Sequence, residues 1–189
     1  MNLPNKLTIL RVCMIPLFLA LYFLTGIPGN YLWALAVFSA ASLTDMADGR
    51  IARSQGLITD FGKLMDPLAD KLLVISAMVC LLQGSSLNLI CLILVISREL
   101  LVTSIRLLAA GKGIVIPADI WGKLKTVTQM VWICLSLLHM ALAYNFAAPV
   151  QLLSWLGCLV LALFGVMMVL SVVSGLHYLM QNRSLFSDA

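Results

Sequence analysis

Apolar residues fill most of the chain in long runs that short polar stretches interrupt. Breaks at residues 26–30, 83–86 and 144–149 contain no Lys, Arg, Asp or Glu, whereas those at 50–63 and 111–119 are charged. The segments between the breaks are each long enough to supply the roughly 20 helical residues that a bilayer core requires. The pattern predicts an all-α integral membrane protein with six transmembrane helices, at 7–25, 31–53, 64–82, 87–110, 120–144 and 150–181.

Composition supports a membrane protein and excludes an ordinary soluble domain. Of the 189 residues 62% are hydrophobic and 11% are charged, and the mean hydropathy is +1.05, whereas soluble domains carry about 25% charged residues. No Pro-, Gly- or Ser-rich linker divides the chain, so we expect one transmembrane domain over residues 1–189. The basic residues flank helices and form no run, which argues against a nucleic-acid partner.

The charges also predict an orientation. Outside the helices, Lys and Arg occur at the N-terminus, in the two charged loops and at Arg183. Cytoplasmic loops of membrane proteins carry the excess of Lys and Arg. We therefore expect both termini and both charged loops in the cytoplasm.

Four aspartates flank the first charged loop. Asp45 and Asp48 end the second helix, Asp66 and Asp70 begin the third, and each pair shares a helical face. Four converging carboxylates repel one another unless cations lie between them. Without His or Cys nearby they suit Mg²⁺ or Mn²⁺, and four can hold two such ions, an arrangement that clamps a diphosphate. The alternative, two unrelated pairs of aspartates that end helices near water, explains the joint spacing poorly.

Other residues of this stretch suit a phosphate ligand. Gly49 and Gly62 remove side chains where a ligand or neighbouring helix comes close, and Arg53 offers a fork of donors to phosphate oxygens. The stretch 45–70 reads D-x-x-D-G-x-x-A-R-x(8)-G-x-x-x-D-x-x-x-D. It resembles the signature of the CDP-alcohol phosphatidyltransferase family, whose core is also six helices with cytoplasmic termini.

The resemblance implies roles for these residues. Asp45, Asp48 and Asp66 would bind the metals, and Asp70 would complete the site as the general base that takes a proton from an attacking alcohol. That alcohol would displace CMP from a CDP-lipid at the lipid-side phosphorus. The residues implied at the CDP-lipid are Gly49, Arg53, Thr59 and Gly62, with Asn5, Thr8 and Arg11 matching the family's early Asn/Thr/Arg element.

A second set of cations bears on the acceptor alcohol. Arg98 and Arg106 differ by about 80° around one helix, so both can face the same cavity. Lys125 shares a face with Gln129, whereas Lys123 points elsewhere. Snorkelling explains cations near helix ends but not Arg98, which lies deep in its helix. Arg98, Arg106 and Lys125 therefore favour an acceptor that carries its own phosphate.

Segments 97–106 and 122–130 resemble the bacterial branch of the family that produces phosphatidylglycerophosphate. This resemblance implies that the partners are CDP-diacylglycerol and glycerol 3-phosphate, and that the active site faces the cytoplasm at a bacterial inner membrane. It also places Glu99 in the pocket wall, paired with one arginine. A homodimer is usual for the family, and Gly157, Gly165 and Gly175 allow close helix approach.

Two alternatives remain open at this point. A sister enzyme would use the same CDP-lipid with inositol phosphate, serine or phosphatidylglycerol as the acceptor. A divalent-cation transporter would use the aspartates as an ion path, but it leaves Gly49, Arg53 and the eight-residue spacing unexplained.

Overall fold

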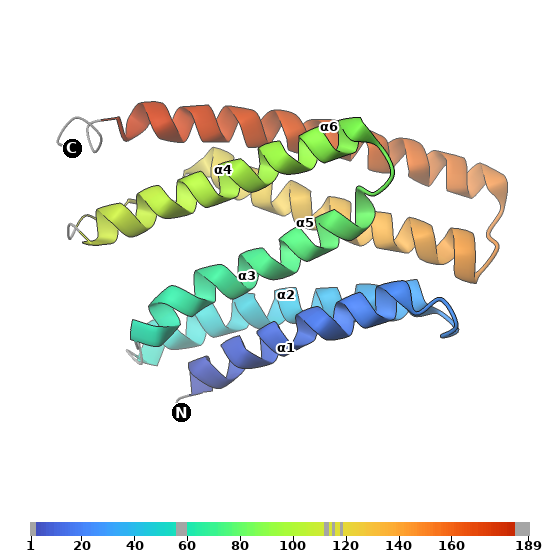
Figure 1. Ribbon diagram of the computed structural model, residues 1–189, viewed down its shortest axis with the longest axis horizontal. Coiled ribbons are helices and arrows are strands. Elements are labelled where there is room, and N and C mark those ends of the chain that lie inside the picture. Colours follow the sequence, from blue (N-terminus) through green and yellow to red (C-terminus); the bar gives the residue numbers. More distant parts are fainter. Residues whose placement is uncertain (1–2, 56–59, 112–113, 115, 118, 184–189) are drawn as a thin grey trace. The chain divides into compact units, whose positions relative to one another are not determined.

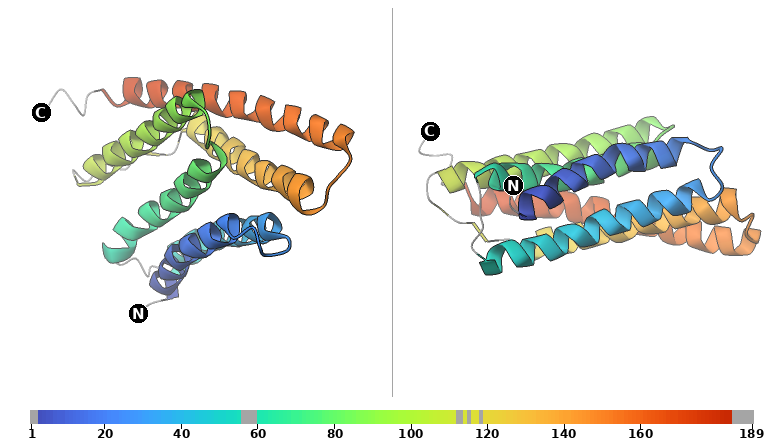
Figure 2. Two further views of the ribbon diagram at one scale, coloured as in Figure 1. Left: turned by 45° about the vertical axis from the view of Figure 1, so that its right-hand side comes forward. Right: turned by 90° about the horizontal axis from the view of Figure 1, so that it is seen from below.

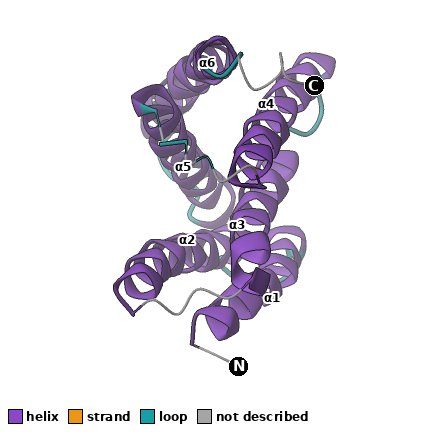
Figure 3. Ribbon diagram, turned by 90° about the vertical axis from the view of Figure 1, so that its left-hand side faces the viewer, coloured by secondary structure: helices purple, strands orange, loops and turns teal. Residues whose placement is uncertain are grey.

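The computed structural model describes residues 3–55, 60–111, 114, 116–117 and 119–183, with only the backbone for 3–8, 45–55, 60–67 and 70. This described part consists of helices and connecting loops and contains no strand (Figures 1 and 3). The all-α prediction is thus confirmed for it. The elements are α1 (Leu3–Phe23), α2 (Asn30–Gln55), α3 (Asp60–Leu81), α4 (Ser86–Gly111), α5 (Ile120–Met140), the π-helix η1 (Ala141–Asn145) and α6 (Val150–Gln181).

The helix boundaries follow the predicted breaks, with two early starts. Helix α1 begins at Leu3 and α3 at Asp60, each four residues before its predicted start. The prediction followed the apolar residues, but helical hydrogen bonding does not stop where the apolar run stops. Pro4 is tolerated in a first helical turn, and an acidic residue at the start of α3 complements the helix dipole.

Three elements are long and apolar enough to cross a membrane. Among the described residues these are Ser86–Gly111, Ile120–Asn145, which joins α5 to η1, and Val150–Gln181. The shorter apolar helical stretches Ile9–Phe23 and Lys71–Leu81 accompany them. Length and composition therefore indicate a membrane protein.

The chain divides into two compact units. Unit 1 comprises Met1–Leu81 and Ile133–Gly157, and unit 2 comprises Leu82–Trp132 and Cys158–Ala189. Each unit combines two separate stretches of sequence, so neither corresponds to one contiguous piece of the chain.

The core of unit 1 lies where α1 packs against α2 and α3, the three helices that run side by side in Figure 1. The rings of Phe18 and Phe38 lie 6.2 Å apart, and both side chains are fully buried. Ala34, Ala41 and Ala77 are also fully buried. Such small side chains let helix backbones approach closely, as is common in membrane proteins.

Polar residues tie the helix ends of unit 1 together. Tyr22 Oη donates to the carbonyl of Cys80 at 2.9 Å, and Asn30 Nδ2 donates to the carbonyl of Tyr22 at 3.3 Å. Asn145 Nδ2 then donates to Asn30 Oδ1 at 3.0 Å. Asn145 closes the π-helix η1, which is followed by the turn into α6 (Figure 2). We call these four residues the polar clamp.

Unit 2 is built from α4, the first half of α5 and most of α6. Val102 and Ile105 of α4 pack with Tyr178 of α6 in a buried cluster. Trp132 and Phe164 place their rings 5.4 Å apart. This packing holds α4, α5 and α6 as a frame for the polar side chains described next.

Candidate active site

The four aspartates lie in the two helices that the sequence predicted. Asp45 and Asp48 belong to the C-terminal part of α2, and Asp66 and Asp70 to the N-terminal half of α3. Because α3 starts at Asp60, Asp66 and Asp70 lie one turn further into it than predicted. Both helices belong to unit 1. The four side chains are outside the described residues, so the metal site stays a prediction.

The residues expected at the CDP-lipid come from the same three helices. Asn5, Thr8 and Arg11 lie on α1, Gly49 and Arg53 on α2, and Gly62 on α3, whereas Thr59 lies outside the described residues. Arg11 is the member of this set whose side chain is described, and it is 2% exposed. Burying a guanidinium is costly without polar or charged partners. We therefore expect polar or charged groups beside the Arg11 guanidinium.

Unit 2 contains a compact network of charged side chains. Arg98 Nη1 donates to Glu99 Oε1 at 3.2 Å, and Lys125 Nζ contacts the same oxygen. Lys125 Nζ also donates to Gln129 Oε1 at 2.6 Å, and its side chain is fully buried. The expected association of Glu99 with an arginine is thus present, and the shared face of Lys125 and Gln129 is confirmed.

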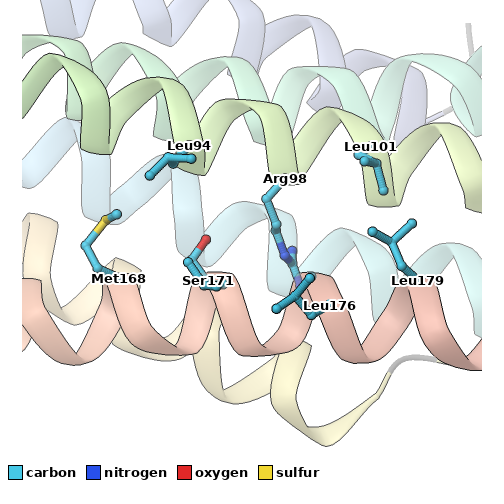
Figure 4. Close-up of a pocket in the computed structure, with 9 residues that line it drawn as sticks. Leu94, Arg98, Leu101, Met168, Ser171, Leu176 and Leu179 are labelled. Carbon is cyan, nitrogen blue, oxygen red and sulfur yellow. The ribbon is translucent and has the colours of Figure 1, made fainter.

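Arg98 leaves α4 and reaches α6. Its Nη2 donates to Ser174 Oγ at 2.9 Å, and only 12% of its side chain is exposed. Figure 4 shows Arg98 pointing from α4 toward α6. Arg98 lines a cleft of about 190 Å³ between these helices. Apolar residues such as Leu94, Leu101 and Met168 line this cleft. The guanidinium is therefore held by specific partners in mostly apolar surroundings.

Arg106 occupies a different place. Its side chain is exposed, and its guanidinium lies 5.5 Å from the ring centre of Tyr178, a cation–π contact. It does not line the cleft that contains Arg98. The angle of about 80° between the two arginines permitted a shared cavity, but the aromatic ring of Tyr178 offers Arg106 an alternative partner.

The structure adds residues that the sequence did not single out for this site. Ser174 is buried and follows Arg98 by 76 positions, so no local pattern links the two. The sequence indicates only that Gly175 allows close helix approach, whereas in the structure the stem of Arg98 fills the space beside it. The sequence signal that could have indicated them is that Ser174 and Gly175 are two adjacent small residues in an otherwise strongly apolar helix.

Comparisons with known proteins agree on one family. The family model described as CDP-alcohol phosphatidyltransferase matches residues 1–176. The CDP-diacylglycerol–glycerol-3-phosphate 3-phosphatidyltransferase of Bacillus subtilis is 38% identical and covers 96% of this chain and 95% of its own. The protein of the same name from Rickettsia typhi is 42% identical over 68% of this chain and 72% of its own. The "Probable phosphatidylglycerophosphate synthase" of Mycobacterium tuberculosis is 42% identical over 79% of this chain and 72% of its own.

Proposed function

Because the chain belongs to the CDP-alcohol phosphatidyltransferase family, we propose that it transfers the phosphatidyl group of CDP-diacylglycerol to glycerol 3-phosphate and releases CMP. The product is phosphatidylglycerophosphate, a precursor of phosphatidylglycerol. The observation that carries this choice of acceptor is the cation pair of Arg98 and Lys125, which contact one oxygen of Glu99. The relatives from Bacillus subtilis and Rickettsia typhi are named for this reaction.

The cation pair fits a phosphate-bearing acceptor. Two donors that meet at one carboxylate oxygen are close enough to reach different oxygens of a single phosphate group. Charge-assisted hydrogen bonds of this kind are about twice as strong as neutral ones. An uncharged alcohol such as inositol offers these two cations no anionic group. Arg106, exposed on the same helix as Arg98, stays a candidate for guiding the acceptor.

The aspartates of α2 and α3 supply the metal-dependent part of the proposal. Asp45, Asp48, Asp66 and Asp70 form an all-oxygen donor set, which suits two Mg²⁺ or Mn²⁺ ions. When bound, such ions neutralise the diphosphate and stabilise the leaving oxygen of CMP. Asp70 accepts the proton of the glycerol 3-phosphate hydroxyl. That oxygen then bonds to the lipid-side phosphorus while the bond from this phosphorus to the CMP oxygen breaks.

The proposed binding site for the cytidine nucleotide is formed by α1, the C-terminal end of α2 and the N-terminal end of α3. Support comes from the buried guanidinium of Arg11, which shares unit 1 with both aspartate pairs. A positive charge in this position favours a diphosphate ligand. The proposed contacts are Asn5, Thr8, Arg11, Gly49, Arg53, Thr59 and Gly62.

The membrane topology completes the proposal. We propose that the chain crosses a bacterial inner membrane six times and that both termini and the active site lie on the cytoplasmic side. We also propose that residues 1–189 form one domain. The support is the absence of charge from breaks 26–30, 83–86 and 144–149. A homodimer is the proposed assembly.

A panel of acceptors tests the function. The purified full chain in mixed micelles receives labelled CDP-diacylglycerol, Mg²⁺ or Mn²⁺, and one of glycerol 3-phosphate, inositol phosphate, serine or phosphatidylglycerol. We expect CMP release with glycerol 3-phosphate. Release with another acceptor alone would assign the chain to a sister activity. Metal flux in proteoliposomes without any CMP release would instead support a transporter.

A further inference from the structure

Gly175 of α6 lies directly beside the stem of Arg98. A Cβ atom at position 175 would lie 3.0 Å from Arg98 Cγ and 4.0 Å from Arg98 Cβ. Carbon atoms in van der Waals contact are about 3.5–4.0 Å apart. The hydrogen that glycine carries in place of a side chain therefore leaves the space through which Arg98 passes from α4 to α6.

The close contact is near the base of the arginine and not at its flexible end. Cγ is followed by Cδ, Nε and the guanidinium carbon, so displacing Cγ swings the whole charged group. The guanidinium makes two hydrogen bonds, to Ser174 Oγ at 2.9 Å and to Glu99 Oε1 at 3.2 Å. Hydrogen bonds weaken steeply with poor distance and angle. A small shift at Cγ is thus enough to disturb both.

Other glycines of unit 2 differ from Gly175 in this respect. A Cβ at Gly165, on the same helix, would meet no atom within 4 Å. A Cβ at Gly122 of α5 would lie 3.6 Å from Arg98 Nη2, an ordinary van der Waals distance. Among these three, the tight contact is the one at Gly175.

We propose that Gly175 is a positioning residue for the acceptor site, because the absence of a side chain there sets where the Arg98 guanidinium lies. This inference rests on the proposed function, in which Arg98 binds the phosphate of glycerol 3-phosphate. Gly175 touches no substrate. It acts through Arg98, and its effect falls on the phosphate-bearing acceptor and spares the CDP-lipid.

Steady-state kinetics of Gly175→Ala and Gly165→Ala test the proposal. For Gly175→Ala we expect the KM for glycerol 3-phosphate to rise about 10- to 100-fold, as small misplacements in active sites do. The KM for CDP-diacylglycerol stays within about twofold of wild type, because the substitution weakens binding of the acceptor and leaves binding of the CDP-lipid intact. Gly165→Ala is the matched control, with the same substitution in the same helix, and keeps both constants.

A double-mutant cycle separates this role from a general packing effect. In an Arg98→Ala background, Gly175→Ala has nothing left to displace, so it causes no further change in acceptor KM. If the two substitutions raise the acceptor KM independently, so that their effects multiply in the double variant, the inference is overturned. If Gly175→Ala alone does not fold, Arg98→Ala should restore its thermal unfolding temperature, and failure of that rescue also overturns it.

The activity of the wild-type chain distinguishes a failure of the proposed function from a failure of the inference about Gly175. If it releases no CMP with glycerol 3-phosphate, the proposed function is wrong and the inference falls with it. If it is active and Gly175→Ala keeps the wild-type KM for glycerol 3-phosphate, the inference alone is wrong.

Discussion

Two lysines two positions apart in α5 have opposite surroundings. Lys125 is fully buried against Glu99 and Gln129, whereas Lys123 is exposed. A buried cation is tolerated when it is paired and hydrogen-bonded. The burial of Lys125 therefore indicates a specific role for its charge, while Lys123 fits a snorkelling side chain.

The two lysines provide a matched pair for mutation. We expect Lys125→Met to lower kcat/KM for glycerol 3-phosphate about 10- to 100-fold, since hydrogen bonds to charged groups contribute about 1.5–3 kcal/mol. Lys123→Met should stay within about twofold of wild type. Acceptor titrations of both variants check this. Equal kinetics for the two would remove Lys125 from the acceptor site.

Asp70 has the proposed role of general base. Asp70→Asn removes the proton acceptor and keeps a similar shape, so we expect turnover to fall at least about 100-fold while CDP-diacylglycerol binding is largely retained. Asp60→Asn, on the same helix but outside the fixed positions of the signature, serves as the control. Single-turnover CMP release and equilibrium binding measure the two effects. Wild-type turnover in Asp70→Asn would exclude the role.

At the scale of the elements, η1 and the polar clamp make a prediction about stability. Asn145→Ala removes the donor to the amide oxygen of Asn30, whose side chain is 1% exposed. Leaving a buried polar group unpaired costs about 1–3 kcal/mol. We expect a lower thermal unfolding temperature in detergent and an unchanged acceptor KM. Ser154→Ala, at an exposed position, is the control. Equal unfolding temperatures for Asn145→Ala and Ser154→Ala would show that the hydrogen bond from Asn145 does not contribute to stability.

The helices were largely predictable from sequence because polar breaks mark their ends. The predicted start at residue 120 and the predicted span 150–181 match the structure. The bond from Arg98 to Ser174 was not predictable, since it joins residues of different helices and depends on how α4 and α6 pack. The contact of Arg106 with Tyr178 was missed for the same reason. Helical periodicity assigns a direction to a side chain but does not identify its partner.

At the scale of the whole molecule, the proposed topology is testable with single cysteines. The five native cysteines are first replaced, because all are free thiols in the described structure. Ser85→Cys and Arg183→Cys then report on opposite sides, and both positions are exposed. In intact spheroplasts we expect a membrane-impermeant maleimide to label position 85 only. In inverted vesicles it should label position 183 only, and labelling of both from one side would refute the assignment.

The contact between Arg98 and Glu99 has a consequence for biosynthesis. A lone arginine in the middle of a hydrophobic helix costs about 2.5–3.5 kcal/mol during insertion by the translocon. Ser174 follows Arg98 by 76 residues, whereas Glu99, whose Oε1 lies 3.2 Å from Arg98 Nη1 in the folded protein, follows it directly in the sequence. We therefore expect the acidic residue next to the arginine to lower the cost of its charge while the nascent α4 inserts, before α5 and α6 have been synthesised.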